Sequence, residues 1–290
     1  IFKAVIAPPA EKAVAENDAW TLLWDAAEDD LNAEEWLAAG FSNLVLQKKV
    51  YAWKNDKVLL GLHTESRARL NRFMPLLLKA LSALENPAVV FDRLLPLLKA
   101  VLRRSSYLVL LLENPQALKQ LVLLVRSSTW IAEQLAEWPV LLDELIDIRN
   151  LYRDIAPSRE DLSSLLRQHM LRIPEDDLEA QMEALRQFKL AHSLRAAACE
   201  VTGRLQLMKV SDYLTFMAET ILDFVLRLAW RLLVEKHGVP YLDVNIASDL
   251  GFIVIGYGKL GGLELGHGSD LDLVFIHAGS SGETQADTSI

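Results

Sequence analysis

Two aspartates late in the sequence, Asp270 and Asp272, have a spacing that suits metal chemistry. They open an apolar stretch, Leu271 to Ile276, that is expected to be a strand. Residues two apart in a strand point to the same face and lie about 6.5 Å apart. Carboxylates so placed can share two divalent ions, and oxygen ligands suit Mg²⁺ bound to substrate phosphates. The pair predicts a magnesium site, although Asp-x-Asp alone often only flanks a turn.

Glycines gather just before these aspartates. Seven of the 13 glycines lie between residues 251 and 268. Without β-carbons, such a loop lets backbone N–H groups approach phosphate oxygens closely. Lys259 could add a point charge, although an exposed helix lysine would look the same, and Ser269 could donate to a phosphate oxygen. Together with the aspartates, the loop predicts a metal–nucleotide site rather than a flexible linker.

Apolar segments on both sides of the glycine-rich loop indicate strands. Phe252 to Ile255 forms the first, and Leu271 to Ile276 forms the second. Strand, glycine loop and strand predict an α/β unit. A short helix is expected from Lys259 to Leu265, with its N-terminus favourable for an anion. The side chains expected on the core face of the second strand are Leu271, Leu273 and Phe275.

The residues before 251 are predicted to be mainly helical. Only four glycines precede that point. Leu70, Phe73 and Leu77 recur at helical spacing, and Asn86-Pro87 and Asn114-Pro115 each start a new helix because proline is tolerated at the first position. Residues 22 to 37 are expected to form one helix. Antiparallel helices packed through such apolar faces form a bundle.

Two further helices are expected in the second half. Pro174 is expected to begin the longest helix, because acidic residues follow it and suit the positive end of the dipole. Ser211 is expected to cap the next helix, which ends at His237-Gly238. The two apolar stripes are Leu178, Met182, Leu185 and Phe188, and then Leu214, Met217, Ile221, Val225, Leu228 and Leu232.

Composition excludes several classes of function. The 290 residues carry a net charge of −9 without a block of Lys or Arg, so nucleic acid is a poor partner. No run of 18 apolar residues occurs, which argues against a membrane span. The one cysteine, Cys199, cannot form an internal disulfide, which fits a reducing cytoplasm, and its alanine-rich helix favours a buried structural thiol.

The string from Gly256 to Phe275, Gly-Tyr-Gly-Lys-Leu-Gly-Gly-Leu-Glu-Leu-Gly-His-Gly-Ser-Asp-Leu-Asp-Leu-Val-Phe, resembles glutamine synthetase adenylyltransferase. That family is part of the DNA polymerase β-like nucleotidyltransferase superfamily. The resemblance extends over about residues 65 to 278. It includes the segments Pro139–Asp147, Arg172–Asp177, Glu183–Lys189 and Met208–Thr215.

The resemblance implies an activity and its partners. The family has two related nucleotidyltransferase halves, and the Gly-Tyr-Gly-Lys motif resembles that of the C-terminal, adenylylating half. It implies transfer of AMP from ATP to a tyrosine of glutamine synthetase with two Mg²⁺ ions, and regulation by the PII signal protein. By the same resemblance, Asp270 and Asp272 hold the metal, and Gly256, Gly258 and the Gly268-Ser269 pair hold the phosphates.

This chain departs from the family pattern in two places. The family often has an aromatic residue at the position of His267, which is therefore given no role. The superfamily also has a third carboxylate on a later strand, and Asp287 is a poor substitute for it. The chain is therefore expected to end inside the catalytic domain.

The domain expectation is an N-terminal, partly helical segment (1–61), a helical domain (62–245) and the beginning of the nucleotidyltransferase domain (246–290). Three alternatives stay open. The chain could belong to the deadenylylating, phosphorolytic half or to another protein nucleotidyltransferase. It could also be a helical interaction module with an incomplete site.

Overall fold

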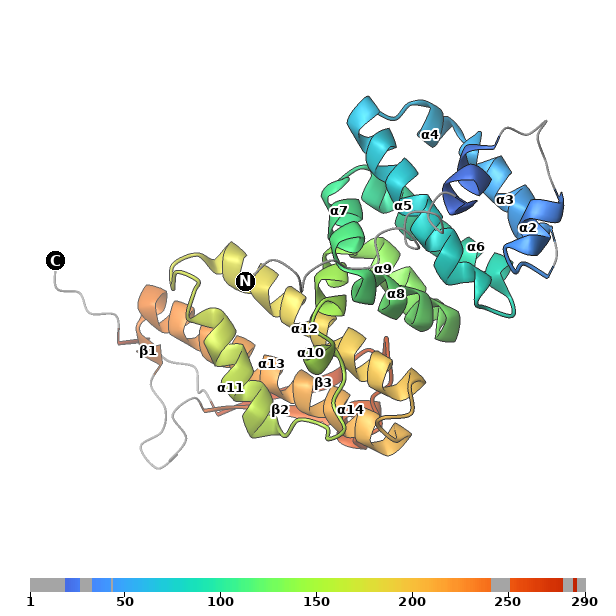
Figure 1. The fold of residues 1–290 in the computed structure, drawn as a ribbon. Coiled ribbons are helices and arrows are strands. Elements are labelled where there is room, and N and C mark those ends of the chain that lie inside the picture. Colours follow the sequence, from blue (N-terminus) through green and yellow to red (C-terminus); the bar gives the residue numbers. More distant parts are fainter. Residues whose placement is uncertain (1–18, 27–32, 43, 241–250, 279–283, 286–290) are drawn as a thin grey trace, which may run out of the picture. The chain divides into compact units, whose positions relative to one another are not determined.

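The structure is a computed structural model. It describes residues 19–26, 33–42, 44–240, 251–278 and 284–285. Contacts divide the chain into two compact units, Ile1–Ile148 and Arg149–Ile290, each of which is described by itself. The division falls inside the helical domain expected from the sequence, whose boundaries at 62 and 246 remain predictions. Most described residues are helical (Figure 1), as expected.

The first unit is built of helices. After a helical stretch over residues 19–25, its elements are α2 (Ala33–Ala38), α3 (Val45–Lys54), α4 (Lys57–Leu60), α5 (Thr64–Ser82), α6 (Pro87–Leu102), α7 (Ser106–Glu113), α8 (Pro115–Ser127), α9 (Thr129–Glu137) and the 3₁₀ helix η2 (Pro139–Leu145). The expected starts at Pro87 and Pro115 are confirmed. Leu70, Phe73 and Leu77 are buried, so the stripe on α5 is a core face as predicted.

The single helix expected over residues 22 to 37 is wrong. The helical stretch ends at Asp25, and Ala26 is not helical, whereas residues 27–32 lie outside the described residues. Side chains of α3 donate hydrogen bonds to the carbonyl groups at this helix end. Lys54 Nζ donates to the carbonyl of Trp24 at 2.6 Å and to that of Ala26 at 3.1 Å, and the Tyr51 hydroxyl also donates to Ala26 at 3.2 Å.

In its described residues, the second unit combines three longer helices and two short ones with two small, two-stranded sheets. After α10 (Ile148–Leu151), its elements are α11 (Arg159–Met170), α12 (Leu178–Val201), α13 (Leu207–His237), β1 (Val239–Pro240), β2 (Phe252–Tyr257), α14 (Gly258–Gly261), β3 (Asp272–His277) and β4 (Thr284–Gln285). Its core gathers buried side chains of α11, α12 and α13, with Leu260 and Leu265 from the glycine-rich loop. The loop is therefore packed onto the helices and is not a free linker.

The starts of the two long helices differ from expectation. α12 begins at Leu178 rather than at Pro174, because the Asp177 side chain caps it by accepting from the Ala180 N–H at 2.9 Å. α13 begins at Leu207, with Gln206 as its N-cap, so Ser211 is interior. α13, with 31 residues, is longer than α12, with 24. Its end at His237 followed by Gly238 is confirmed, since Gly238 has φ +76°.

The apolar stripes of these helices are only partly buried. On α12, Leu185 and Phe188 are buried, but Leu178 and Met182 are exposed. On α13, Leu214, Met217 and Leu228 are buried, while Val225 is 42% exposed. Spacing alone identified the helical face correctly but overestimated how much of it is covered within the described residues.

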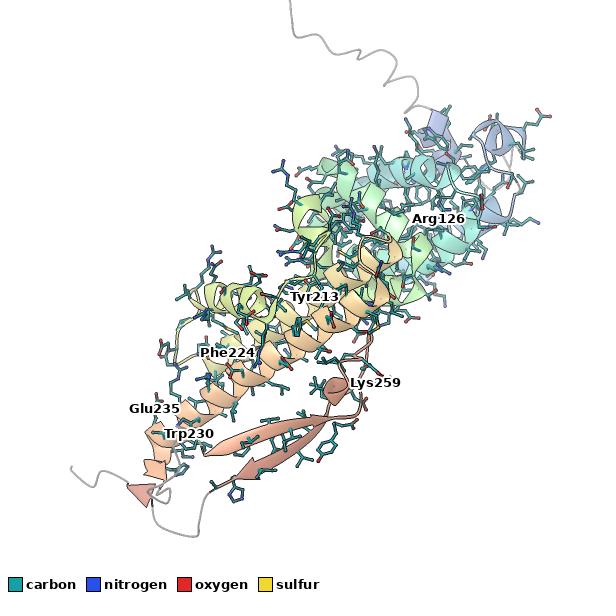
Figure 2. All side chains as sticks on the ribbon, turned by 90° about the horizontal axis from the view of Figure 1, so that it is seen from below. Arg126, Tyr213, Phe224, Trp230, Glu235 and Lys259 are labelled. Carbon is teal, nitrogen blue, oxygen red and sulfur yellow. The ribbon has the colours of Figure 1, made fainter. Side chains whose placement is uncertain are left out.

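Strands β2 and β3 pair antiparallel, from Phe252 opposite His277 to Tyr257 opposite Asp272. Both strands were expected at nearly these bounds. Figure 2 shows the hairpin alongside α13, and Leu273 packs against the core. Leu271 and Phe275, also expected in the core, are 38% and 58% exposed. Their exposure follows from the small size of the sheet, because among the described strands only β2 pairs with β3. Phe275 lies against Phe252 of β2, with ring centroids 5.9 Å apart.

Among the described residues, no single helix is long and apolar enough to cross a membrane. Helices α7 and α8 reach that length and hydropathy only when taken together, and the chain bends by 104° between them.

Candidate functional site

The glycine-rich loop begins against an aspartate of the neighbouring strand. Tyr257 ends β2 opposite Asp272 of β3, and Gly258 follows with φ +55°. A β-carbon built on Gly258 would overlap Oδ2 of Asp272. Both the backbone conformation and the close approach therefore require glycine at this position. The loop and the aspartate predicted from the sequence are thus in direct contact.

Helix α14 folds tightly back on the end of β2. Leu260, which is 6% exposed, holds it to the core. A β-carbon on Gly256 would lie 2.8 Å from the Leu260 side chain, and one on Gly261 would lie 2.5 Å from the carbonyl oxygen of Gly256. Glycine at both positions allows this close packing, which fixes the loop relative to the strand.

The helix expected from Lys259 to Leu265 is a single turn that ends at Gly261. It closes with a Schellman motif, in which the Glu264 N–H donates to the Lys259 carbonyl at 2.8 Å and the Leu263 N–H donates to Leu260 at 3.2 Å. Leu263 takes the left-handed conformation, φ +57°, which costs a non-glycine residue about 1–2 kcal/mol. One turn sums few peptide dipoles, so the expected contribution of a helix N-terminus to anion binding is small.

A tight turn precedes the aspartates. The Ser269 N–H donates to the Gly266 carbonyl at 3.1 Å, and the Gly266 N–H donates to the Ser269 hydroxyl oxygen at 3.1 Å. Gly268 lies within the turn with φ +77°. Because the hydroxyl of Ser269 accepts here, its own proton remains available for another acceptor, such as a phosphate oxygen. The turn therefore leaves the Ser269 hydroxyl able to donate a hydrogen bond.

Asp270 and Asp272 are both exposed, but only Asp272 is in the strand. Asp270 precedes β3, so the expectation that both carboxylates lie within one strand is wrong by two residues. Among the described residues, no group of three or more His, Cys, Asp or Glu side chains could hold a metal ion. Mg²⁺ usually binds through one or two carboxylates plus substrate phosphates and water, so an exposed pair of carboxylates beside a glycine-rich loop still fits this ion.

A cavity of about 410 Å³ lies between α12, α13 and the loop. Its lining includes Ser269 and Asp270 from the loop and an apolar floor from α13. Lys189 and Ser193 of α12 also line it. The i, i+4 spacing of these two residues places them on one helix face, but nothing in the sequence predicted that this face lines the cavity.

Not all predicted site residues share this cavity. Gly256 instead lines a second cavity, of about 510 Å³, between α13 and β2. Lys259 lies exposed on α14, at the end of the hairpin where β2 stops (Figure 2). Asp287, the poor substitute for the third carboxylate, lies outside the described residues.

His267 and Glu200 form a contact that the sequence analysis missed. His267 Nε2 lies 2.6 Å from Oε2 of Glu200, which is in the last turn of α12. The two residues are 67 positions apart in the sequence, so no local pattern indicates this pair.

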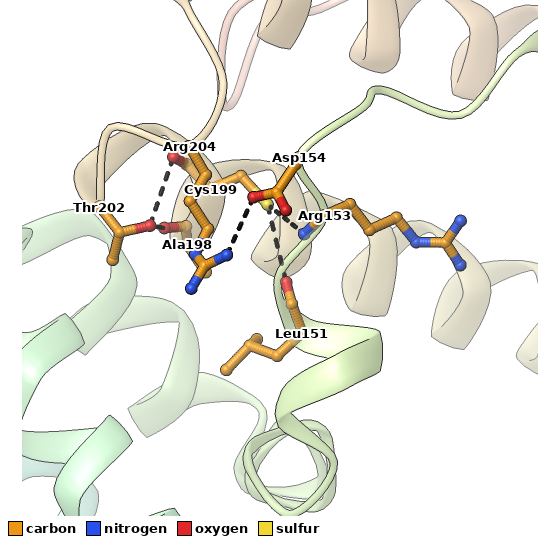
Figure 3. Close-up of polar contacts among 7 residues, drawn as sticks. All are labelled: Leu151, Arg153, Asp154, Ala198, Cys199, Thr202 and Arg204. Carbon is orange, nitrogen blue, oxygen red and sulfur yellow. Dashed lines mark hydrogen bonds and ion pairs between the residues drawn. The ribbon is translucent and has the colours of Figure 1, made fainter.

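The end of α12 near Glu200 is held by a polar network (Figure 3). Cys199 is fully buried, accepts from the Arg153 N–H at 3.3 Å and donates to the Leu151 carbonyl at 3.7 Å, so the predicted structural thiol is confirmed. Burial raises the pKa of this thiol. Arg204 pairs with Asp154 at 2.9 Å. The helix end that carries Glu200 is therefore a fixed support.

Comparison with known proteins identifies the family. A family model described as glutamate-ammonia ligase adenylyltransferase matches residues 118–290. Bifunctional glutamine synthetase adenylyltransferase/adenylyl-removing enzymes are similar to the chain. The Pseudomonas putida protein is 50% identical over 293 residues, covering 99% of this chain and 30% of the relative. The Pseudomonas aeruginosa protein is 48% identical over 286 residues (96% and 29%), and that of Shewanella oneidensis 46% over 278 (95% and 28%).

The chain thus spans about 30% of the length of these relatives. Its match to the family model covers more than half of its own residues and includes the whole glycine-rich loop and both aspartates. The chain belongs to the glutamate-ammonia ligase adenylyltransferase family.

Proposed function

We propose that the protein containing this chain transfers AMP from ATP to a tyrosine of glutamine synthetase, and that residues 256–272 hold the reacting nucleotide. The observation that carries the proposal is the packing of Gly258 against the Asp272 carboxylate, in a segment matched by the family model. That packing puts the glycine backbone, which carries no side chain, next to a carboxylate of the kind that binds metal ions. A phosphate held both by the loop and by a metal ion would need this arrangement.

The hairpin of β2 and β3, with α14 between them, is proposed to begin a nucleotidyltransferase domain of the DNA polymerase β-like type. Its support is the order of its parts, which is strand, glycine-rich turn, a Gly-Ser pair and a strand that opens with aspartate. PII is proposed as a regulatory partner of the whole protein, on the family resemblance alone.

The side chains divide into two roles. Asp270 and Asp272 would hold Mg²⁺, which when bound neutralises phosphate charge and lowers the pKa of the attacking hydroxyl. The Ser269 hydroxyl and the backbone N–H groups near Gly258 and Gly268 bind phosphate oxygens, and Lys259 adds positive charge at the rim. Positioned in this way, the tyrosine hydroxyl gives up its proton to water and its oxygen attacks the α-phosphorus in line. The new O–P bond forms as the bond to pyrophosphate, the leaving group, breaks.

The test uses the full-length protein, ATP labelled at the α-phosphorus, and glutamine synthetase. Asp270→Asn and Asp272→Asn should each lower label transfer by about 100-fold or more, as loss of a transition-state contact does. Asp176→Asn, at an exposed position in the same unit, is the matched control and should transfer normally. Near-normal turnover in either site variant would remove that residue from the reaction.

Two further measurements separate the alternatives. Removal of the adenylyl group from adenylylated glutamine synthetase with phosphate as the acceptor, which yields ADP and the free tyrosine hydroxyl, would assign this segment to the removing reaction instead if it is lost in the same two variants. Nucleotide binding with and without Mg²⁺ tests the interaction-module alternative. Binding that is unchanged by Mg²⁺ and by both substitutions would favour that module over an active site.

A further inference from the structure

We infer that Glu200 and His267 form a clamp that positions the turn carrying Ser269 and Asp270. Glu200 is then a positioning residue of AMP transfer, contributed by the helical part of the unit. This inference rests on the proposed function, because it concerns how the same site is held in place.

The contact itself is well defined. His267 Nε2 and Glu200 Oε2 are 2.6 Å apart, and the side chains of His267 and Glu200 are 19% and 33% exposed. An ionised carboxylate can only accept, so Nε2 carries the proton in this contact. A charge-assisted hydrogen bond that is partly shielded from water is stronger than an exposed ion pair.

The position of Glu200 at the end of α12 also favours the contact. Glu200 lies in the last turn of α12, and its carbonyl accepts from the Gly203 N–H at 2.9 Å as the helix ends. A carboxylate near a helix C-terminus is disfavoured by the negative end of the dipole. A donor from His267 offsets this cost, so helix α12 and the loop stabilise each other at this point.

The clamp acts on Asp270 through a short, stiff path. His267 lies inside the turn that is closed by the two hydrogen bonds between Gly266 and Ser269. On the other side of the turn, Leu265 is 4% exposed and packs in the core. A movement of His267 must therefore move Ser269 and the residue that follows it.

The position of Asp270 depends mainly on this turn. Within the part of the chain that the structure describes, the Asp270 side chain makes no hydrogen bond or ion pair. A displacement of about 1 Å at a reacting group can reduce a rate by about 100-fold. Loss of the clamp should therefore affect turnover and metal binding more than stability.

The experiment compares Glu200→Ala, His267→Ala, the double variant and Glu200→Gln in the full-length protein. Each alanine variant should lower kcat for AMP transfer by about 10- to 100-fold and raise the Mg²⁺ concentration for half-maximal activity, as loss of a supporting residue around a metal site does. The double variant should be no worse than either single variant, because the two residues act as a pair. Glu200→Gln keeps an oxygen acceptor and should recover most of the loss.

Controls separate a positioning role from a structural one. Glu179→Ala, exposed in the first turn of the same helix, should leave kcat and the Mg²⁺ dependence unchanged and lower the melting temperature only slightly, through the lost interaction with the helix dipole. The four site variants should melt within a few degrees of the wild type. A lowered melting temperature with normal kcat and normal Mg²⁺ dependence would overturn the clamp, and so would additive losses in the double variant.

The clamp and the proposed function fail in different ways. If Asp270→Asn abolishes transfer but Glu200→Ala and His267→Ala are normal, the clamp is wrong and the function stands. If Asp270→Asn transfers AMP normally, the assigned site is wrong, and the clamp falls with it.

Discussion

Gly258 lies so close to Asp272 that a β-carbon on the glycine would overlap the carboxylate oxygen Oδ2. The two residues come from opposite ends of the β2–β3 hairpin loop, and the strand pairing that sets Tyr257 opposite Asp272 brings them together. The relationship joins the two parts of the proposed site, since the start of the loop and the carboxylate cannot move independently.

Gly258→Ala should therefore impair AMP transfer without unfolding the protein. Alanine at φ +55° is strained by about 1–2 kcal/mol, and its β-carbon must push the Asp272 carboxylate away. We expect kcat to fall by about 10-fold or more and the Mg²⁺ requirement to rise, as when the support of a metal ligand is lost. Steady-state AMP transfer at varied Mg²⁺ concentration measures both.

Gly262→Ala is the matched control from the same loop. Its backbone has φ −83°, which alanine adopts readily, and the nearest atom to the new β-carbon is the Gly258 carbonyl oxygen at 3.4 Å. Equal damage from both alanines would show that the loop tolerates no side chain anywhere, and the specific contact between Gly258 and Asp272 would lose its support.

The sequence predicted the bounds of the two strands to within two residues, because short apolar runs bounded by glycine are typical of strands. It predicted the helix starts at Pro87 and Pro115 for an equally local reason. It misplaced the start of α12, because Pro174 and the acidic residues after it are also compatible with a turn. The side-chain cap from Asp177 decides that boundary, and it depends on a geometry that the spacing does not encode.

Other features of the site depend on contacts between distant residues. The turn of α14 ends where Leu263 adopts a conformation that normally favours glycine, although two glycines stand just before it. The pairing of His267 with Glu200 requires α12 and the loop to be brought together first. Composition and spacing carry no information about either event, so the loop chemistry could be predicted but its supports could not.

We expect Leu260 to hold the loop in place, so that replacing it destabilises the loop more than the rest of the unit. It is 6% exposed and belongs to the core of the second unit. Leu260→Ala removes buried apolar contacts, which costs about 2–5 kcal/mol at a typical core site. Since this residue holds mainly α14, we expect faster amide hydrogen exchange across residues 256–270 and reduced AMP transfer, while helices α12 and α13 keep their protection.

Leu263→Ala provides the comparison, because Leu263 is 45% exposed and has the same strained backbone in both forms. Its exchange and activity should stay close to the wild type. Protection of residues 256–270 that is unchanged in Leu260→Ala would mean that other contacts hold the loop.

Cys199 should be inert in the folded protein. The thiol is fully buried, and burial raises its pKa, so the unreactive protonated form predominates at neutral pH. Peptide-resolved mass spectrometry should find Cys199 unlabelled by a thiol reagent in native protein and labelled in denaturant. Rapid labelling under native conditions would contradict the buried position.

Cys199→Ala should destabilise the second unit by about 1–3 kcal/mol, because it leaves the Arg153 N–H and the Leu151 carbonyl without their sulfur partner. Cys199→Ser can restore both hydrogen bonds and should be less damaging than alanine. Denaturant unfolding of the two variants measures this difference, and equal stability of alanine and wild type would show that the sulfur contacts contribute nothing.

His192 should make the stability of the second unit depend on pH. It is 3% exposed and lies between α12 and α13, where its Nδ1 is 2.7 Å from the Tyr213 hydroxyl. Burial, followed by the nearby charges of Arg195 and Arg153, lowers the pKa of His192 from 6.5 to about 3. The neutral imidazole is therefore the form that the fold accepts.

The sign of the effect follows from proton binding. The unfolded chain takes up a proton on His192 near pH 6.5, whereas the folded protein does so only near pH 3. The contribution of His192 to stability is thus complete above pH 6.5, is lost as the pH falls, and is gone near pH 3. Between pH 7 and pH 4.5 this should lower the free energy of unfolding by about 2–3 kcal/mol.

His192→Asn tests this directly, because asparagine keeps a hydrogen-bonding group near the Tyr213 hydroxyl and does not titrate. The variant should be less stable at pH 7, since it is smaller and leaves a cavity. Its free energy of unfolding should nevertheless fall less steeply between pH 7 and pH 4.5 than that of the wild type. A slope in His192→Asn that is parallel to that of the wild type would show that another group causes the loss of stability in acid.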